Sequence, residues 1–174
     1  MQLMNLMQHP SAIPLLAQWH FAEWHALFPQ RTEADFATEL TDCLQDASKD
    51  ELQLPLPQTW VVMADDGNIC GSVSLLLQDM ATNRDLSPWL ANVFIAPAYR
   101  GQGLGKQVVL AAMAKVAARQ IPILYLFTED QQPFYARLGW QLHKQEQYEG
   151  VEVSVMFWSP KLADGLNRGQ TPRG

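Results

Sequence analysis

The sequence predicts a mixed α/β fold in which a central, mostly antiparallel sheet is flanked by helices. Strand-like runs rich in Val and Leu alternate with segments of helical spacing, and two pairs of these runs are joined by short turn signals. The chain has 174 residues, of which 48% are hydrophobic and 17% are charged, and this is enough to bury one core. We expect a single domain over residues 1–160 and a polar, frayed tail over residues 161–174.

The N-terminal quarter is expected to form a short strand, two helices and a loop, over residues 1–7, 11–28, 32–46 and 47–57. Apolar residues recur at helical spacing in the first helix. Thr32 is the predicted N-cap of the second helix, with Asp35 in the place of the usual Glu of a capping box. The loop is polar at first and is then interrupted by prolines.

The rest of the chain alternates strands and helices. The predicted strands are residues 59–64, 69–78, 89–95, 121–127, 140–148 and 151–158, and the predicted helices are residues 103–119 and 132–138. Asp65-Asp66-Gly67-Asn68 and Glu149-Gly150 are typical hairpin turns, and residues 79–87 form a longer connection. Gly139 is a natural C-cap of the last helix. The run 121–127 is apolar, as expected of a strand buried on both faces.

The segment from Arg100 to Lys106 is the most informative one. It carries glycine at three alternate positions, after a strand and before a helix. Glycine lets the backbone curl tightly, and the first amides of a helix have no internal partner. These amides and the helix dipole form a cradle for a phosphate or pyrophosphate, flanked here by two cationic side chains.

Two common phosphate loops do not fit this segment. The dinucleotide fingerprint needs a third glycine where this chain has Lys106 or Val108, counted from Gly101 or Gly103. The nucleotide-triphosphate loop needs Ser or Thr after Gly-Lys, and Gln107 stands there.

What remains is Arg-x-x-Gly-x-Gly after the strand end Val93-Phe94-Ile95-Ala96-Pro97. This string resembles the acetyl-CoA loop of the GNAT acetyltransferase superfamily. A second resemblance lies downstream, where Phe134-Tyr135-Ala136-Arg137-Leu138-Gly139-Trp140 is similar to the segment that GNAT enzymes place near the thiol end of the cofactor. The two motifs occur in the family's order, and the resemblance is tight from about Trp89 to Trp140.

The resemblance implies a site for acetyl-CoA. Backbone amides from Gln102 to Lys106 would hold the pyrophosphate, and Arg100 would either contact a phosphate or brace the loop. The end of the preceding strand would lie along the pantetheine arm. The expected cofactor-binding residues are therefore Phe94, Ile95, Arg100, Gly101, Gln102, Gly103, Leu104, Gly105 and Lys106.

The resemblance also implies that the Tyr135 hydroxyl donates a proton to the departing thiolate. Many GNAT enzymes place an acidic general base near the fourth strand, where this chain has only Asn92, a residue that orients water but accepts no proton. The base is unassigned, with candidates at His20, Glu23, Asp79, Asp85 and Glu129.

The acceptor site is the least specified part of the sequence. Glu23, Trp24, Trp89 and Asn92 are the candidate acceptor contacts, with His25 in the same region. The acceptor is expected to be a small-molecule or peptide amine, and an acidic surface would favour a cationic one. Oligomeric state is open, and a homodimer is compatible with the sequence.

Composition excludes several other classes. A net charge of −6 argues against a nucleic-acid or anionic-membrane binder. The N-terminus lacks the pattern of a signal peptide and no apolar run is long enough to span a bilayer, so we expect a cytoplasmic protein. Cys43 and Cys70 are expected to be buried thiols, and the four histidines are too scattered for a metal site.

The sequence therefore favours an N-acetyltransferase that moves the acetyl group of acetyl-CoA to a primary amine by direct attack in a ternary complex. Two alternatives stay open. One is a non-catalytic acyl-CoA-binding sensor, and the other is a protein-interaction module without CoA affinity.

Overall fold

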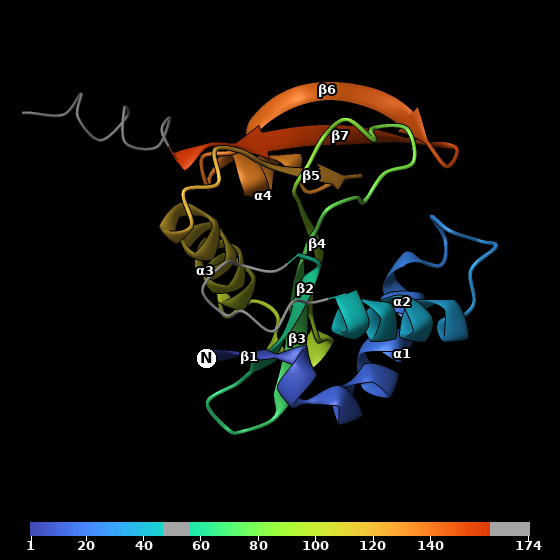
Figure 1. Ribbon diagram of the computed structural model, residues 1–174, viewed down its shortest axis with the longest axis vertical. Coiled ribbons are helices and arrows are strands. Elements are labelled where there is room, and N and C mark those ends of the chain that lie inside the picture. The colour runs from blue at the N-terminus through green and yellow to red at the C-terminus, as the bar shows by residue number, and fades with distance from the viewer. Residues whose placement is uncertain (47–55, 161–174) are drawn as a thin grey trace, which may run out of the picture.

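The computed structural model describes residues 1–46 and 56–160, and seven strands form one sheet in this part of the chain (Figure 1). The strands are β1 (Gln2–Asn5), β2 (Gln58–Met63), β3 (Ile69–Leu76), β4 (Trp89–Ile95), β5 (Leu124–Thr128), β6 (Gln141–Tyr148) and β7 (Val151–Trp158). Their order across the sheet is β1-β2-β3-β4-β5-β7-β6. Neighbouring strands are antiparallel except β4 and β5, which are parallel. The predicted mixed, mostly antiparallel sheet is confirmed.

Helices cover both faces of the sheet (Figure 1). They are α1 (Ile13–Trp24), α2 (Glu33–Asp46), α3 (Leu104–Ala118) and the short α4 (Gln132–Ala136), with 3-10 turns η1 (Leu6–Gln8), η2 (Pro10–Ala12) and η3 (Pro97–Tyr99). Side chains on β2 point alternately to the two faces. Trp60 and Val62 pack in a cluster with α3, whereas Val61 packs with Leu16 of α1 and Phe36 of α2.

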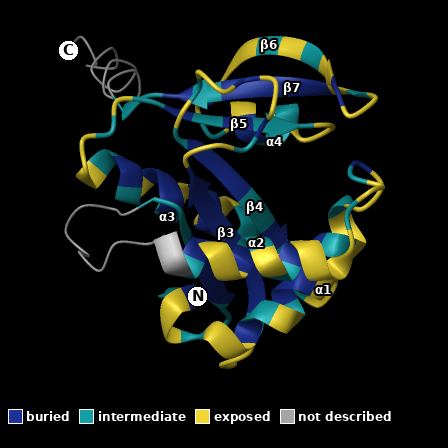
Figure 2. Cartoon of the chain, turned by 45° about the vertical axis from the view of Figure 1, so that its right-hand side comes forward, coloured by how far each residue is buried: buried dark blue, intermediate teal, exposed yellow. Residues whose placement is uncertain are grey.

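Burial follows this layering (Figure 2). Strand β3 is buried from Cys70 to Leu76, and α1 and α2 turn exposed residues outward. Strand β6 is the outer edge of the sheet and is mostly exposed. Both cysteines are buried, Cys43 on α2 and Cys70 on β3.

The local signals for caps and turns are confirmed. The Thr32 amide and hydroxyl donate to the Asp35 carboxylate (2.7 and 2.8 Å), and the Asp35 amide donates back to the Thr32 hydroxyl (3.3 Å). These bonds lower the pKa of Asp35. Gly67, Gly139 and Gly150 have φ angles of +83°, +91° and +82°, so all three need the freedom of glycine.

Several predicted boundaries are wrong. Strand β1 ends at Asn5, whose side chain accepts a hydrogen bond from the Met7 amide (2.9 Å) and starts a 3-10 turn. Strand β5 begins at Leu124 rather than at residue 121, because the Ile121 amide still bonds Val116 O of α3 (3.2 Å). Its side chains alternate between buried and half-buried, so it is not buried on both faces. The predicted tail over residues 161–174 and most of the predicted loop over residues 47–57 lie outside the described residues.

Candidate active site

The sheet opens between β4 and β5. These two strands pair at one position, Trp89 with Tyr125, and the Tyr125 amide donates to Pro88 O (2.9 Å) just before β4 begins. Beyond this point β4 continues along β3 up to Ile95, while β5 continues along β7 up to Thr128. The backbone groups that face the gap are therefore left without a neighbouring strand.

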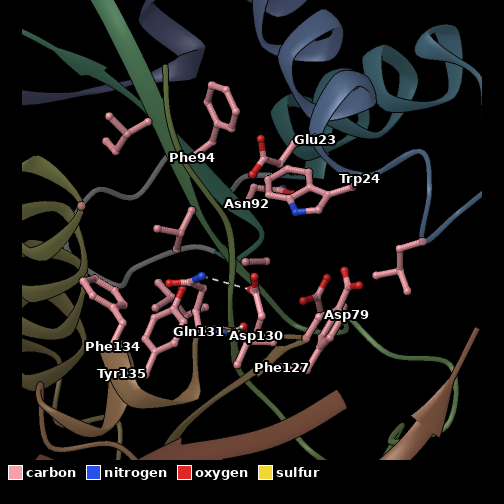
Figure 3. A pocket seen from close by; sticks show the side chains of 18 of the residues that line it. Glu23, Trp24, Asp79, Asn92, Phe94, Phe127, Asp130, Gln131, Phe134 and Tyr135 are labelled. Atoms are coloured by element: carbon pink, nitrogen blue, oxygen red, sulfur yellow. Dashed lines mark hydrogen bonds between the residues drawn. The ribbon is translucent and has the colours of Figure 1, made fainter. Parts of the chain in front are cut away.

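A cleft of about 1430 Å³ lies at this opening (Figure 3). It is lined from one side by α1, by β4 and by the N-terminus of α3, and from the other side by β5 and α4. The cleft thus joins the glycine segment, the divergent strands and Tyr135. These are the three parts that the sequence motifs predict for one site.

The glycine segment leaves a run of amides available at the N-terminus of α3. Among the described residues, Arg100 N donates to Pro97 O (3.2 Å) and Gln107 N donates to Gly103 O (3.2 Å), and no carbonyl accepts from the amides of residues 101–106. Gly101 and Gly103 both have φ of +76°, a conformation that other residues rarely adopt. The unpaired amides and the helix dipole make this a site for an anion.

Arg100 braces this segment. Its Nε donates to Ile95 O (2.8 Å), its Nη2 forms an ion pair with Glu23 of α1 (3.1 Å), and its guanidinium lies 5.5 Å from the Phe94 ring centroid. Of the two roles open to Arg100 from the sequence, the structure favours the bracing one. Lys106 remains exposed at the cleft.

Tyr135 lies on α4 and points into the cleft (Figure 3). Its ring makes edge contacts with Phe134 and Trp140, at centroid distances of 5.0 and 5.9 Å. Burial raises the pKa of Tyr135 above its usual value, so the group stays protonated at neutral pH. No described residue accepts a hydrogen bond from its hydroxyl. The hydroxyl is therefore available to donate to a group in the cleft.

A bulge interrupts β4 where the strand lines the cleft. The register between β3 and β4 shifts between Ser72 and Ser74, and Asn92 opposite them has φ of +52°. The Ser72 hydroxyl donates to Asn92 O (2.9 Å), and the Asn92 amide group donates to the Ser74 hydroxyl (3.0 Å). Both backbone and side chain of Asn92 are thus fixed by β3.

His20 of α1 completes this polar cluster. Its Nε2 lies 2.8 Å from the Ser72 hydroxyl. The Ser72 proton is used toward Asn92 O, so His20 Nε2 is the donor in this pair. Burial, reinforced by the charge of Arg31, lowers the pKa of His20 to about 3. His20 is neutral at physiological pH and positions the bulge, so its candidacy as general base is wrong.

Comparison with known proteins agrees with this geometry. Residues 57–142 match the family model described as acetyltransferase (GNAT) domain. The chain belongs to the GNAT acetyltransferase superfamily. It is therefore an acyltransferase by family. No significant match to the sequence was found among curated proteins.

Solved structures with the same fold include three GNAT relatives at low identity. An aminoglycoside 6'-N-acetyltransferase complexed with coenzyme A superposes with a TM-score of 0.68 at 14% identity, covering 91% of this chain and 97% of that chain. Aminoglycoside 6'-acetyltransferase type Ii gives a TM-score of 0.65 at 15% identity, with coverages of 91% and 97%. The protein yncA from Salmonella typhimurium, solved with its cofactor acetyl-CoA, superposes with a TM-score of 0.62 at 12% identity. The match covers 91% of this chain and 94% of that chain. At these identities the likeness concerns the fold.

In this GNAT acetyltransferase, the cofactor residues predicted from the sequence come together. Nearly all of them line the cleft: Phe94, Ile95, Arg100, Gly101, Gly103, Leu104, Gly105 and Lys106. Gln102 lies among them on the same exposed turn, although it does not line the cleft. The Phe94 side chain is itself buried against α1, where it stacks on Trp19 (5.4 Å between centroids). The Phe94 ring therefore packs against α1 at the wall of the cleft.

Some of the residues predicted to contact the acceptor line the cleft, and others do not. Glu23, Trp24 and Asn92 line the cleft, as predicted. The prediction that Trp89 contacts the acceptor is wrong, because its side chain is fully buried and its Nε1 donates to Leu86 O (2.7 Å). His25 is exposed and bonds Phe21 O of its own helix (3.0 Å), outside the cleft.

The remaining base candidates also divide. Glu129 and Asp79 line the cleft, whereas Asp85 is exposed outside it. Asp79 is half-buried, and burial together with the charge of Glu39 raises its pKa to about 7. Arg31 acts in the opposite direction, but its guanidinium already forms an ion pair with Glu39.

Sequence reasoning missed the serine pair and the far wall of the cleft. Ser72 and Ser74 are fully buried at alternate positions of an otherwise apolar strand, and this polar stripe was a signal in the sequence. Phe28, Phe127 and Tyr148 form an aromatic wall, with centroid distances of 6.3 Å from Phe28 to Tyr148 and 5.5 Å from Phe127 to Tyr148. No local sequence pattern predicts this wall, because its three residues lie far apart in the chain.

Metal clusters and membrane-spanning helices are both absent from the described residues. They hold no group of three His, Cys, Asp or Glu side chains arranged to bind a metal ion. None of the helices in residues 1–46 and 56–160 is long and apolar enough to cross a membrane.

Proposed function

We propose that this chain transfers the acetyl group of acetyl-CoA to a primary amine, by direct attack in a ternary complex. The observation that supports this most strongly is that one cleft contains the unpaired amides at Gly101 to Lys106, the divergent end of β4 and the available hydroxyl of Tyr135. A binding module needs the first two features. The third is a proton donor.

The residues fit acetyl-CoA, which supplies the activated acetyl thioester. The amides at the N-terminus of α3 bind the diphosphate, and Lys106 adds positive charge beside them. The unpaired edge of β4 bonds the amides of the pantetheine arm, as it would bond an added strand. The Tyr135 hydroxyl then donates its proton to the sulfur that leaves.

The acceptor enters from the opposite end of the cleft, between Trp24 and the aromatic wall of Phe28, Phe127 and Tyr148. Carboxylates from several elements line the cleft: Glu23, Glu39, Asp79, Glu129, Asp130 and Glu149. Two of them are neutralised by arginines and the others favour a positively charged acceptor. We infer a small cationic amine, a class that includes the aminoglycosides after which two of the structural neighbours are named.

The test combines binding and turnover. Isothermal calorimetry with acetyl-CoA measures binding, and release of free thiol with a panel of one aminoglycoside, one diamine and one amino acid measures transfer. Tyr135→Phe should keep the affinity for acetyl-CoA and lose most of the turnover, by about 100-fold. Tyr125→Phe is the matched control, because Tyr125 lies on β5 outside the cleft.

A non-catalytic acyl-CoA-binding domain is the second candidate, and it is favoured by the absence of an acid on β4. It predicts heat on adding acetyl-CoA but no thiol release with any amine. A wild-type protein that gives neither heat nor thiol release would refute both candidates.

A further inference from the structure

The connection between β3 and β4 is held firmly over the cleft, although it contains no helix or strand. The Ala81 amide donates to the Tyr148 hydroxyl (3.4 Å), which ties the connection to β6. The Thr82 hydroxyl and the Asn83 side-chain amide both donate to one carboxylate oxygen of Glu146 (2.8 and 2.7 Å). Asn83 is 2% exposed. A side chain on this connection therefore has a defined position in the site.

Asp79 is the third residue of this connection and points into the cleft, on the side opposite Tyr135 in the view of Figure 3. It is half-buried, and its carboxylate makes no hydrogen bond or ion pair with any residue in the described ranges. The nearby guanidinium of Arg31 is held by Glu39 and lies 4.0 Å from the Phe36 ring centroid. Asp79 is thus a carboxylate with no cation of its own.

The titratable groups that line the cleft together with Asp79 come from several neighbouring elements. Arg31 follows α1, Glu39 lies on α2, Arg84 lies on the same connection, and Tyr148 and Glu149 lie at the end of β6. Burial is the main cause that raises the pKa of Asp79 to about 7, Glu39 adds to it, and Arg31 opposes it. A carboxylate of this kind is partly ionised near neutral pH, which suits proton transfer.

The other carboxylates of the cleft fit this role less well. Glu23 is paired with Arg100 (3.1 Å) and Glu39 is paired with Arg31. Glu129, Asp130 and Glu149 are exposed to solvent. Asn92, the polar residue of β4 in the cleft, accepts no proton.

We propose that Asp79 takes the proton from the ammonium group of the acceptor, either directly or through one water molecule. This inference rests on the proposed function. One N–H bond of the ammonium breaks and one O–H bond forms on Asp79, which leaves a lone pair on nitrogen. As the C–N bond forms and the C–S bond breaks, Tyr135 gives its proton to sulfur and regains one from the nitrogen. Asp79 finally releases its proton to water, so the reaction yields one amide, one thiol and one proton.

The test is the pH dependence of kcat/KM for Asp79→Asn, measured with acetyl-CoA and two acceptors. One is an alkyl diamine, whose ammonium has a pKa of about 10 as in Lys. The other is a hydrazide, which is already unprotonated at neutral pH. With the diamine, the wild-type rate should rise with pH through about 7. For Asp79→Asn, kcat/KM with the diamine should be about 100-fold lower than for the wild type at pH 7, and it should rise only near the pKa of the amine. With the hydrazide the loss should be less than about 10-fold.

Two further variants sharpen the test. Glu39→Gln removes the negative charge that adds to the raised pKa of Asp79. In this variant kcat/KM with the diamine should therefore begin to rise at a lower pH than in the wild type. Asp85→Asn, an exposed change on the same connection outside the cleft, is the matched control and should leave the profile unchanged. Equal affinity for acetyl-CoA by calorimetry shows that the variants are folded.

The outcomes separate the two proposals. Suppose that the wild type acetylates an amine, but that Asp79→Asn keeps the wild-type pH profile or shows the same fall in kcat/KM with both acceptors. Asp79 is then not the base, and the proposed function stands. If the wild type binds acetyl-CoA but acetylates neither acceptor nor any amine of the panel, the proposed function fails and this inference fails with it.

Discussion

Replacing His20 by Gln should make the protein less sensitive to mild acid. His20 is 1% exposed and neutral, and its pKa falls from 6.5 to about 3 on folding. Between these two pH values His20 is protonated in the unfolded chain but not in the folded chain. The free energy of unfolding is therefore highest above pH 6.5 and decreases as the pH falls toward 3. One pKa unit corresponds to about 1.4 kcal/mol. His20 therefore costs the wild type about 2 kcal/mol at pH 5 and about 4 kcal/mol at pH 3.

Gln at this position keeps an N–H donor for Ser72 but does not titrate. We expect His20→Gln to be less stable than the wild type at pH 7.5, because its packing is imperfect, and to recover about 2 kcal/mol of that difference at pH 5. The assay is urea unfolding of both proteins at the two pH values. His25→Gln, an exposed change at the C-cap of the same helix, is the matched control. A difference between wild type and His20→Gln that is equal at pH 5 and pH 7.5 would refute a neutral, buried His20.

Three other predictions test the cofactor loop and the core. Gly103→Ala should cost about 1–2 kcal/mol of stability because of its φ of +76°, whereas at Gly105 an added Cβ meets only side-chain atoms at 3.9 and 4.0 Å, so Gly105→Ala should fold normally. Calorimetry with acetyl-CoA should show weaker binding for both, and unchanged affinity in Gly105→Ala would mean that no ligand approaches this backbone. Thr32→Ala should lower the free energy of unfolding by about 1 kcal/mol through loss of its cap, with normal turnover. Trp89→Phe should cost about 2 kcal/mol in thermal unfolding because Leu86 O loses its donor, and a changed affinity for acetyl-CoA would contradict its place outside the cleft.

The parts of the fold that depend on local chemistry were predictable from the sequence. The capping box of Thr32 and Asp35 and the turn at Glu149-Gly150 involve residues at most three positions apart, so their signals survive without knowledge of the rest of the chain. Strand β4 was predicted with its correct bounds because Val, Ile and a following Pro97 delimit it. The glycine segment was predictable for the same reason, since its backbone is dictated by its own residues.

What the sequence did not reveal depends on residues that are distant along the chain. The positive φ of Asn92 is stabilised by Ser72 and Ser74 on β3, and His20 reaches the same cluster from α1. Arg100 could bind either a phosphate or the Glu23 carboxylate, and only the position of α1 decides between these two partners. The raised pKa of Asp79 likewise needs Glu39 and Arg31 from another helix and loop.

The parting of β4 from β5 places two open strand edges inside the molecule. Proteins protect such edges when they lie on the surface, because another chain can add to them and start aggregation. Here the edges line a cleft bounded by α1, α3 and α4, and are not part of the outer rim of the sheet, which is formed by β1 and β6. The unpaired backbone that suits a chain-like cofactor is thus set between helices, whereas an edge at the rim of the sheet is open to a strand of another molecule.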